Sequence, residues 1–84
     1  MHVVADNYIP FLKGILEPYA EVRYLEPEEI TAEAVRHADA LLIRTRTRCD
    51  AALLQGSRVR FIATATIGYD HIDTRYCESH GIFW

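Results

Sequence analysis

Glycine is scarce in this sequence of 84 residues, and the spacing of the glycines excludes the common phosphate-binding loops. The four glycines are Gly14, Gly56, Gly68 and Gly81, and no two of them are close enough for a GxGxxG turn or a P-loop. We therefore identify no cofactor-binding residue in this chain. If the protein uses a dinucleotide, another domain must bind it.

Cysteine is also scarce, and the sequence has neither a positive net charge nor a long apolar run. Cys49 and Cys77 form neither a CxxC nor a CxxH pattern, which predicts no metal site and two reduced thiols in a cytoplasmic protein. The net charge of −3 provides no basic field for nucleic acid or an anionic membrane. No apolar run approaches the ~20 residues that span a bilayer. In other respects the composition is that of an ordinary globular protein.

Short apolar runs mark the expected strands. Residues 2–6, 39–44 and 59–64 are apolar with little alternation, as in strands buried on both faces. Residues 21–25 alternate polar and apolar side chains, which predicts an edge strand. The apolar residues 82–84 follow a helix-ending glycine and predict the start of a fifth strand. We therefore expect this chain to be cut off within its last element.

Segments with helical spacing or capping residues separate these strands. Thr31, Asp50 and either Asp70 or Asp73 can cap three helices. A further helix is predicted to begin at Pro10 and to end near Pro18. Its apolar stripe consists of Phe11, Leu12, Ile15, Leu16 and Tyr19.

The alternation of strands with helices of about 8 to 10 residues predicts an α/β fold with a parallel sheet and right-handed crossovers. The strand 21–25 belongs at an edge, and the strands 2–6 and 39–44 belong in the middle. This arrangement predicts a flavodoxin-like three-layer sandwich with the strand order 2-1-3-4-5.

Polar residues gather where the expected strands end, at the edge of the sheet where ligands bind in open α/β folds. Arg44 and Thr45 follow one strand, and Thr66 and Gly68 follow the next. Their guanidinium, hydroxyl and N–H groups suit a small anion. We expect Thr66 to face Thr45 with Arg44 beside them, although Arg44 could equally form a structural ion pair. Arg46 and Arg48 are interpreted as surface residues.

His71 is the most conspicuous candidate for catalysis, because it lies between Asp70 and Asp73 at the start of an expected helix. A histidine in such a turn more commonly packs or caps than acts as a general base. We therefore interpret His71 as structural.

Three segments resemble the N-terminal part of the D-2-hydroxyacid dehydrogenases. They are the Asp6-Asn7 opening with Pro10, the strand from Ala38 to Thr45 with Thr47 beyond it, and residues 64–73, which read TATIGYDHID. The strand-end arginine and the Gly-x-Asp-His-Ile-Asp turn are shared across this superfamily. The Thr-Ala-Thr and the opening segment resemble the branch that oxidises 4-phospho-D-erythronate.

The resemblance implies a substrate-binding domain in residues 1–84, with an NAD-binding Rossmann domain and a dimerisation region outside this chain. The family's histidine base, its orienting glutamate and its substrate-polarising arginine lie downstream, so we expect no catalytic residue here and no activity from these residues alone. Thr45 and Thr66 fall on substrate-contacting positions, where the family often has serine in place of Thr45. Arg44 and Gly68 are weaker candidates.

The resemblance also implies the reaction. A phosphorylated 2-hydroxy acid would lose a hydride from C2 to NAD, giving 3-hydroxy-2-oxo-4-phosphooxybutanoate in the biosynthesis of pyridoxal 5′-phosphate (vitamin B6) by a cytoplasmic homodimer. A neighbouring branch acting on glyoxylate or hydroxypyruvate, 3-phosphoglycerate or D-lactate shares most of these features. A non-enzymatic receiver domain has the same strand order, but it needs an aspartate where Arg44 stands.

Overall fold

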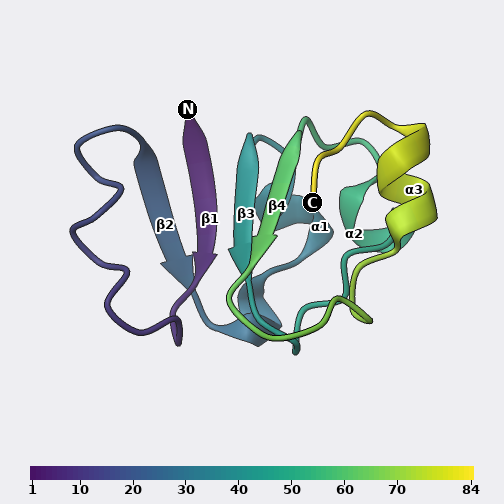
Figure 1. The fold of residues 1–84 in the computed structure, drawn as a ribbon. Helices are drawn as coiled ribbons and strands as arrows, with labels where there is room; N and C mark the ends of the chain where they lie inside the picture. Colours follow the sequence, from purple (N-terminus) through teal and green to yellow (C-terminus); the bar gives the residue numbers. More distant parts are fainter.

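Four parallel strands form the centre of the computed structural model, which describes residues 1–84 (Figure 1). They are β1 (His2–Asp6), β2 (Glu21–Leu25), β3 (Ala40–Ile43) and β4 (Phe61–Thr64), in the spatial order β2-β1-β3-β4. A parallel bridge between Phe61 and Phe83 continues the sheet beyond β4. The predicted order is thus confirmed for four strands, and Phe83 lies where a fifth would begin.

The position of each strand follows its apolar content. In β1 every residue after His2 is buried, and β3 is buried except for Leu42. In β2 no residue is fully buried. The predictions that β1 and β3 are central and that β2 is an edge strand are therefore confirmed.

Three short helices lie behind the sheet or beyond its β4 edge. They are α1 (Ala32–Val35), α2 (Ala51–Leu54) and α3 (Thr74–Ser79), of which α1 lies behind the sheet in Figure 1, and α2 and α3 lie beyond β4. No helix is long and apolar enough to cross a membrane. The core between these layers is one apolar cluster that includes Val4, Leu41, Ile43 and Ile62 from the strands and Val35, Leu53, Leu54 and Cys77 from the helices.

Side-chain caps begin all three helices. Thr31 accepts a hydrogen bond from the Ala34 N–H, Asp50 from the Leu53 N–H and Asp73 from the Tyr76 N–H. The structure thereby selects Asp73 rather than Asp70 for α3. The helices have four to six residues, shorter than the 8 to 10 expected. Gly56 and Gly81 explain two of the early ends, because each adopts a positive φ one residue beyond the helix's C-cap.

Replacing Asp73 by alanine is expected to lower the free energy of unfolding by about 1 kcal/mol, because the Tyr76 N–H loses its acceptor at 3.1 Å. Urea denaturation followed by circular dichroism measures this loss. The matched control is Asp70→Ala, which removes an exposed carboxylate that caps no helix and should change stability by less than about 0.5 kcal/mol. Equal losses in both variants would contradict the assignment of the cap.

The helix predicted from Pro10 to Pro18 is not formed, and this prediction was wrong. Phe11 has a φ of 63° and is 92% exposed, and Ile15 and Tyr19 are exposed as well. A short amphipathic helix gains most of its stability from burying its apolar face, and these side chains find no surface to cover within the 84 residues. Gly14, at a φ of 93°, weakens helix formation further. The helical layer expected on the second face of the sheet is therefore not supplied by this segment.

Candidate functional site

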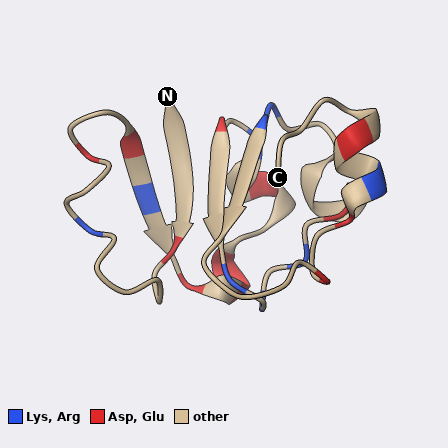
Figure 2. Ribbon diagram, viewed as in Figure 1, with Lys and Arg blue, Asp and Glu red and all other residues tan.

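The carboxyl ends of all four strands meet at one edge of the sheet, at the bottom of Figure 1. Four loops leave this edge, after Asp6, Leu25, Ile43 and Thr64. Acidic and basic residues are both present along it (Figure 2). The parallel register explains why residues far apart in the sequence come together here.

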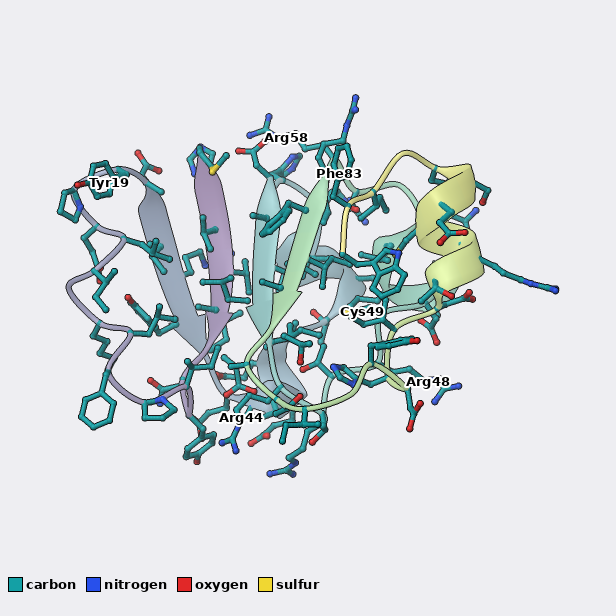
Figure 3. The ribbon with its side chains drawn as sticks, in the orientation of Figure 1. Tyr19, Arg44, Arg48, Cys49, Arg58 and Phe83 are labelled. Carbon is teal, nitrogen blue, oxygen red and sulfur yellow. The ribbon has the colours of Figure 1, made fainter.

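Arg44 lies at one cavity of this edge, which has a volume of about 220 Å³ and which we call the arginine cavity. Its guanidinium donates a hydrogen bond from Nη1 to the carbonyl oxygen of Tyr8 at 3.2 Å, which joins the end of β3 to the loop after β1. Arg44 is half-buried and points away from the lower end of the sheet (Figure 3). The cavity is lined by Asp6, Tyr8, Pro27, Arg44, Thr45 and Arg46.

Glu26 and Asp6 hold the Tyr8 loop in place. The Tyr8 hydroxyl donates to Glu26 Oε1 at 2.6 Å, and the Asn7 amide donates to Glu26 Oε2 at 2.8 Å. These hydrogen bonds lower the pKa of the Glu26 carboxyl and raise the pKa of the Tyr8 phenol, so Glu26 is kept ionised. The Tyr8 N–H donates to Oδ1 of the buried Asp6 at 2.8 Å. The backbone oxygen that contacts Arg44 is thus fixed from two sides.

Thr66 belongs to a second cavity, with a volume of about 370 Å³, which extends along β4 to the loop after Thr64 and which we call the threonine cavity. Its hydroxyl lies 2.8 Å from Thr64 Oγ1, which in turn lies 3.0 Å from His71 Nε2. Gly68 has a φ of 87°, a conformation that favours glycine. The lining comprises Phe61, Ile62, Ala63, Thr64, Thr66, Gly68, Tyr69, Ile72 and Trp84.

The structure therefore divides the four predicted site residues into two pairs. Arg44 and Thr45 line the arginine cavity, whereas Thr66 and Gly68 line the threonine cavity. The two pairs are neighbours, because Ile43 pairs with Thr64 and the Ala65 N–H donates to the Ile43 carbonyl at 2.9 Å. A ligand that contacts both threonines must span the ends of β3 and β4.

Tyr8 and Arg46 also line the arginine cavity, which the sequence did not predict. Arg46 follows Arg44 by two residues, and this i, i+2 spacing after a strand was a usable signal. Nothing in the sequence around Tyr8 predicts that it lines a cavity. Its role depends on the turn that Asp6 stabilises after β1.

His71 is 8% exposed, and its Nε2 is placed beside the Thr64 hydroxyl. Its carbonyl accepts the Cys49 N–H at 2.8 Å, which ties the loop before α3 to the loop before α2. This placement agrees with a packing role. It does not make His71 the helix cap, since Asp73 holds that position.

The two cysteines offer no reactive thiolate. Both are fully buried, and burial raises the pKa of the Cys49 thiol to about 12, so it stays protonated at neutral pH. No group of three or more metal-ligating side chains is present. The arrangement at the strand ends is therefore suited to binding through hydrogen bonds and arginine charge.

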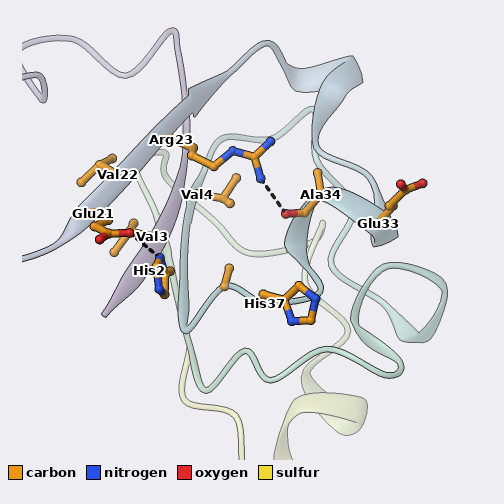
Figure 4. A pocket seen from close by; sticks show the side chains of 10 residues that line it. His2, Val3, Val4, Glu21, Val22, Arg23, Glu33, Ala34 and His37 are labelled. Atoms are coloured by element: carbon orange, nitrogen blue, oxygen red, sulfur yellow. Dashed lines mark hydrogen bonds and ion pairs between the residues drawn. The ribbon is translucent and has the colours of Figure 1, made fainter.

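A further cavity of about 200 Å³ lies at the opposite, amino end of the strands, between β1, β2 and α1 (Figure 4). Three of its titratable side chains, those of His2, Glu21 and Arg23, already have partners within the chain. His2 Nδ1 lies 2.9 Å from Glu21 Oε2, and Arg23 donates to the Ala34 carbonyl at 3.4 Å. It is therefore a weaker candidate than the cavities at the carboxyl ends.

Residues 1–84 match the family described as "D-isomer specific 2-hydroxyacid dehydrogenase, catalytic domain". An erythronate-4-phosphate dehydrogenase of Bacteroides fragilis is 58% identical over 85 residues, covering 100% of this chain and 24% of the relative. The enzyme of the same name from Porphyromonas gingivalis is 50% identical over 84 residues, covering 100% and 23%. The chain thus spans about a quarter of the length of the curated relatives it matches.

Solved structures show the same fold. The TT0316 protein from Thermus thermophilus has a TM-score of 0.81 at 26% identity, over 98% of this chain and 29% of that one. A structure from Polaromonas, described as an NAD-binding D-isomer specific 2-hydroxyacid dehydrogenase, has a TM-score of 0.74 at 25% identity, over 96% and 28%. The α/β fold with its parallel sheet is therefore that of these proteins.

Proposed function

Because the chain belongs to the D-isomer specific 2-hydroxyacid dehydrogenase family, we propose that the protein containing it is an NAD-dependent dehydrogenase of 4-phospho-D-erythronate. In this reaction a hydride passes from C2 of the substrate to NAD, and 3-hydroxy-2-oxo-4-phosphooxybutanoate is formed, a step of pyridoxal 5′-phosphate (vitamin B6) biosynthesis. The observation that carries the proposal is the 58% identity, along the whole chain, to an erythronate-4-phosphate dehydrogenase.

We further propose that these 84 residues bind the substrate. The Arg44 guanidinium and the Thr45 hydroxyl line one cavity and the Thr66 hydroxyl lines the other, at the ends of strands that are neighbours in the sheet, so on this proposal the substrate spans both cavities. Hydroxyl groups and a guanidinium can donate hydrogen bonds to the oxygen atoms of a hydroxy acid. The N–H groups near Gly68 are further candidate donors.

The residues present do not fit a dinucleotide. The four glycines stand far apart in the sequence, and each lies in a separate turn. We therefore place NAD, the proton-accepting histidine, its glutamate and the substrate-polarising arginine on parts of the protein outside these residues. On this proposal the isolated chain produces no NADH. The family resemblance also predicts a cytoplasmic homodimer, which light scattering on the full-length protein would test.

The full-length protein should reduce NAD with 4-phospho-D-erythronate at a kcat/KM at least about tenfold above that for any other 2-hydroxy acid, a difference of about 1.4 kcal/mol in transition-state binding. NADH absorbance measures the rates with a panel of that substrate, glycerate, 3-phosphoglycerate and D-lactate. A preference for one of the other three acids would assign the protein to a neighbouring branch. Oxidation of none of them would refute the proposal.

A further inference from the structure

A chain of three side chains connects the threonine cavity to the one buried histidine. The Thr66 hydroxyl lies 2.8 Å from Thr64 Oγ1, and Thr64 Oγ1 lies 3.0 Å from His71 Nε2. Thr64 and Thr66 line the threonine cavity and are half-buried, whereas His71 is 8% exposed and does not line it. Any influence of the His71 ring on a ligand in this cavity therefore passes through the two hydroxyl groups.

The backbone around His71 holds the ring in place. The His71 carbonyl accepts the Cys49 N–H at 2.8 Å, and the next residue, Ile72, forms a parallel bridge with Cys49. The Cys49 carbonyl in turn accepts the Asp73 N–H at 2.8 Å. Because Cys49 is 0% exposed, these hydrogen bonds anchor the histidine to the core, and the ring is positioned before any ligand binds.

The position of the proton on the His71 ring decides the direction of the whole chain. When Nε2 carries a proton, it donates to Thr64, the Thr64 hydroxyl donates to Thr66, and the Thr66 O–H is free to donate to a ligand. When only Nδ1 carries a proton, Nε2 accepts from Thr64, and Thr64 accepts from Thr66. Thr66 then offers a ligand only lone pairs. Each hydroxyl has a single proton, so the two directions exclude each other.

An acidic ligand requires the first direction. Ionised acid groups accept hydrogen bonds and donate none, so they need the free Thr66 O–H. The first direction is also compatible with the surroundings of the ring. Nδ1 must then accept a hydrogen bond, and it is open to water, because Thr47 Oγ1 is the one buried side-chain nitrogen or oxygen that lacks a partner. A proton on Nε2 thus leaves Nδ1 with an available donor.

We propose that His71 is a positioning residue, which donates from Nε2 to Thr64 and so orients the Thr66 hydroxyl as a hydrogen-bond donor to an anionic oxygen of the substrate. This inference rests on the proposed function, since there Thr66 contacts a 2-hydroxy acid. His71 itself touches neither the substrate nor the cofactor. Its effect is on the affinity for substrate, through the direction of one hydroxyl group.

His71→Leu in the full-length protein removes the donor and keeps a side chain that packs against apolar neighbours. KM for 4-phospho-D-erythronate should rise about fivefold, as expected for the loss of one neutral hydrogen bond, and NAD affinity should stay unchanged. His71→Gln should remain within about twofold of the wild-type KM, because the glutamine amide can donate to Thr64 in place of Nε2. An equal rise in KM in both variants would contradict the proposal.

His80→Leu is the matched control. His80 is exposed, and its ring contacts Ser79 and the Tyr76 carbonyl rather than the two threonines. This variant should leave both KM and NAD affinity at their wild-type values. A rise in KM as large as that in His71→Leu would show that the effect is not specific to the hydroxyl chain, and would overturn the proposal.

A double-mutant cycle separates positioning from a merely structural role. If His71 acts through Thr66, the effects of His71→Leu and Thr66→Val on KM should not add. The double variant should then have the KM of Thr66→Val within about twofold. Additive increases would show that His71 acts by another route, and would refute the inference.

Nitrogen chemical shifts of the histidine ring test the position of the proton without any substrate. The full-length protein is prepared with isotope-labelled histidine and measured above the pH range in which histidine titrates, and His71→Gln identifies the His71 signals by their loss. His71 Nε2 should give the signal of a protonated nitrogen and Nδ1 that of an unprotonated one. The reverse assignment would refute the inference whatever the activity.

The same measurement distinguishes failure of this inference from failure of the proposed function. If Nε2 carries the proton but 4-phospho-D-erythronate is not oxidised, the orientation of the hydroxyl chain stands and the proposed substrate is wrong. The KM comparison is then made with the 2-hydroxy acid that the protein does oxidise.

Discussion

Thr66→Val in the full-length protein is expected to raise KM for 4-phospho-D-erythronate about tenfold and to leave NAD affinity unchanged. Valine keeps the branched shape of threonine and removes the hydroxyl, so the substrate loses one hydrogen bond; bonds to charged groups contribute about 1.5–3 kcal/mol. The fold should survive, because Thr64 keeps its contact with His71 at 3.0 Å when the Thr66 hydroxyl is lost. Initial rates of NADH formation at varied substrate and varied NAD separate the two affinities.

Thr66→Ser is the control for this experiment, since it retains the hydroxyl and removes only a methyl group. It should stay within about threefold of the wild-type KM, as expected for the loss of one methylene-sized group. Kinetics of Thr66→Val that match the wild type would show that the Thr66 hydroxyl does not contact substrate. In that case the threonine cavity would no longer be part of the proposed site.

Leu41→Ala is expected to lower the free energy of unfolding by about 2–5 kcal/mol, because it leaves a cavity in the core. Leu41 is 0% exposed and lies on the central strand β3, between Val4 of β1 and Ile62 of β4. A chain of this size has a total stability of about 4–13 kcal/mol, so this single loss approaches the limit of folding. Urea denaturation of the 84-residue chain, followed by circular dichroism, measures it.

Leu42→Ala is the matched control, because it removes the same atoms from the adjacent residue. Leu42 is half-buried and points to the opposite face of the sheet, which no helix of this chain covers. We expect a loss of about 1 kcal/mol, since less apolar surface leaves water at this position on folding. Losses of equal size at Leu41 and Leu42 would contradict a core on one face of the sheet.

Residue patterns predicted part of the candidate site. Thr45 and Thr66 could be placed at the ends of neighbouring strands, because runs of apolar residues locate strand ends and parallel strands align them. The division into two cavities could not be predicted, since it depends on the course of the loops beyond those ends. Arg46 is exposed, as the sequence predicted, but its position beside the arginine cavity depends on the same loop course and could not be predicted.

The segment between β1 and β2 shows the opposite case, in which a clear pattern predicted the wrong structure. Its helical spacing predicts an apolar face, but a helix of this length needs a surface on which to bury that face. Phe11 and Tyr19 are instead exposed, and Glu17 accepts a hydrogen bond from the Tyr24 hydroxyl at 2.8 Å. The spacing of apolar residues shows which side chains a helix could bury, but it does not show whether the rest of the chain offers a surface against which to bury them.

The sequence alone determined the strands, their parallel order and the helix starts at Thr31 and Asp50, because each depends on local residue types: unbroken apolar runs and capping oxygens. The tertiary structure alone decided that Asp73 rather than Asp70 caps α3, and that Arg44 and Arg46 share a cavity with Tyr8. These outcomes depend on the paths of loops, and a loop is placed by contacts between residues far apart in the chain, such as Arg44 with Tyr8.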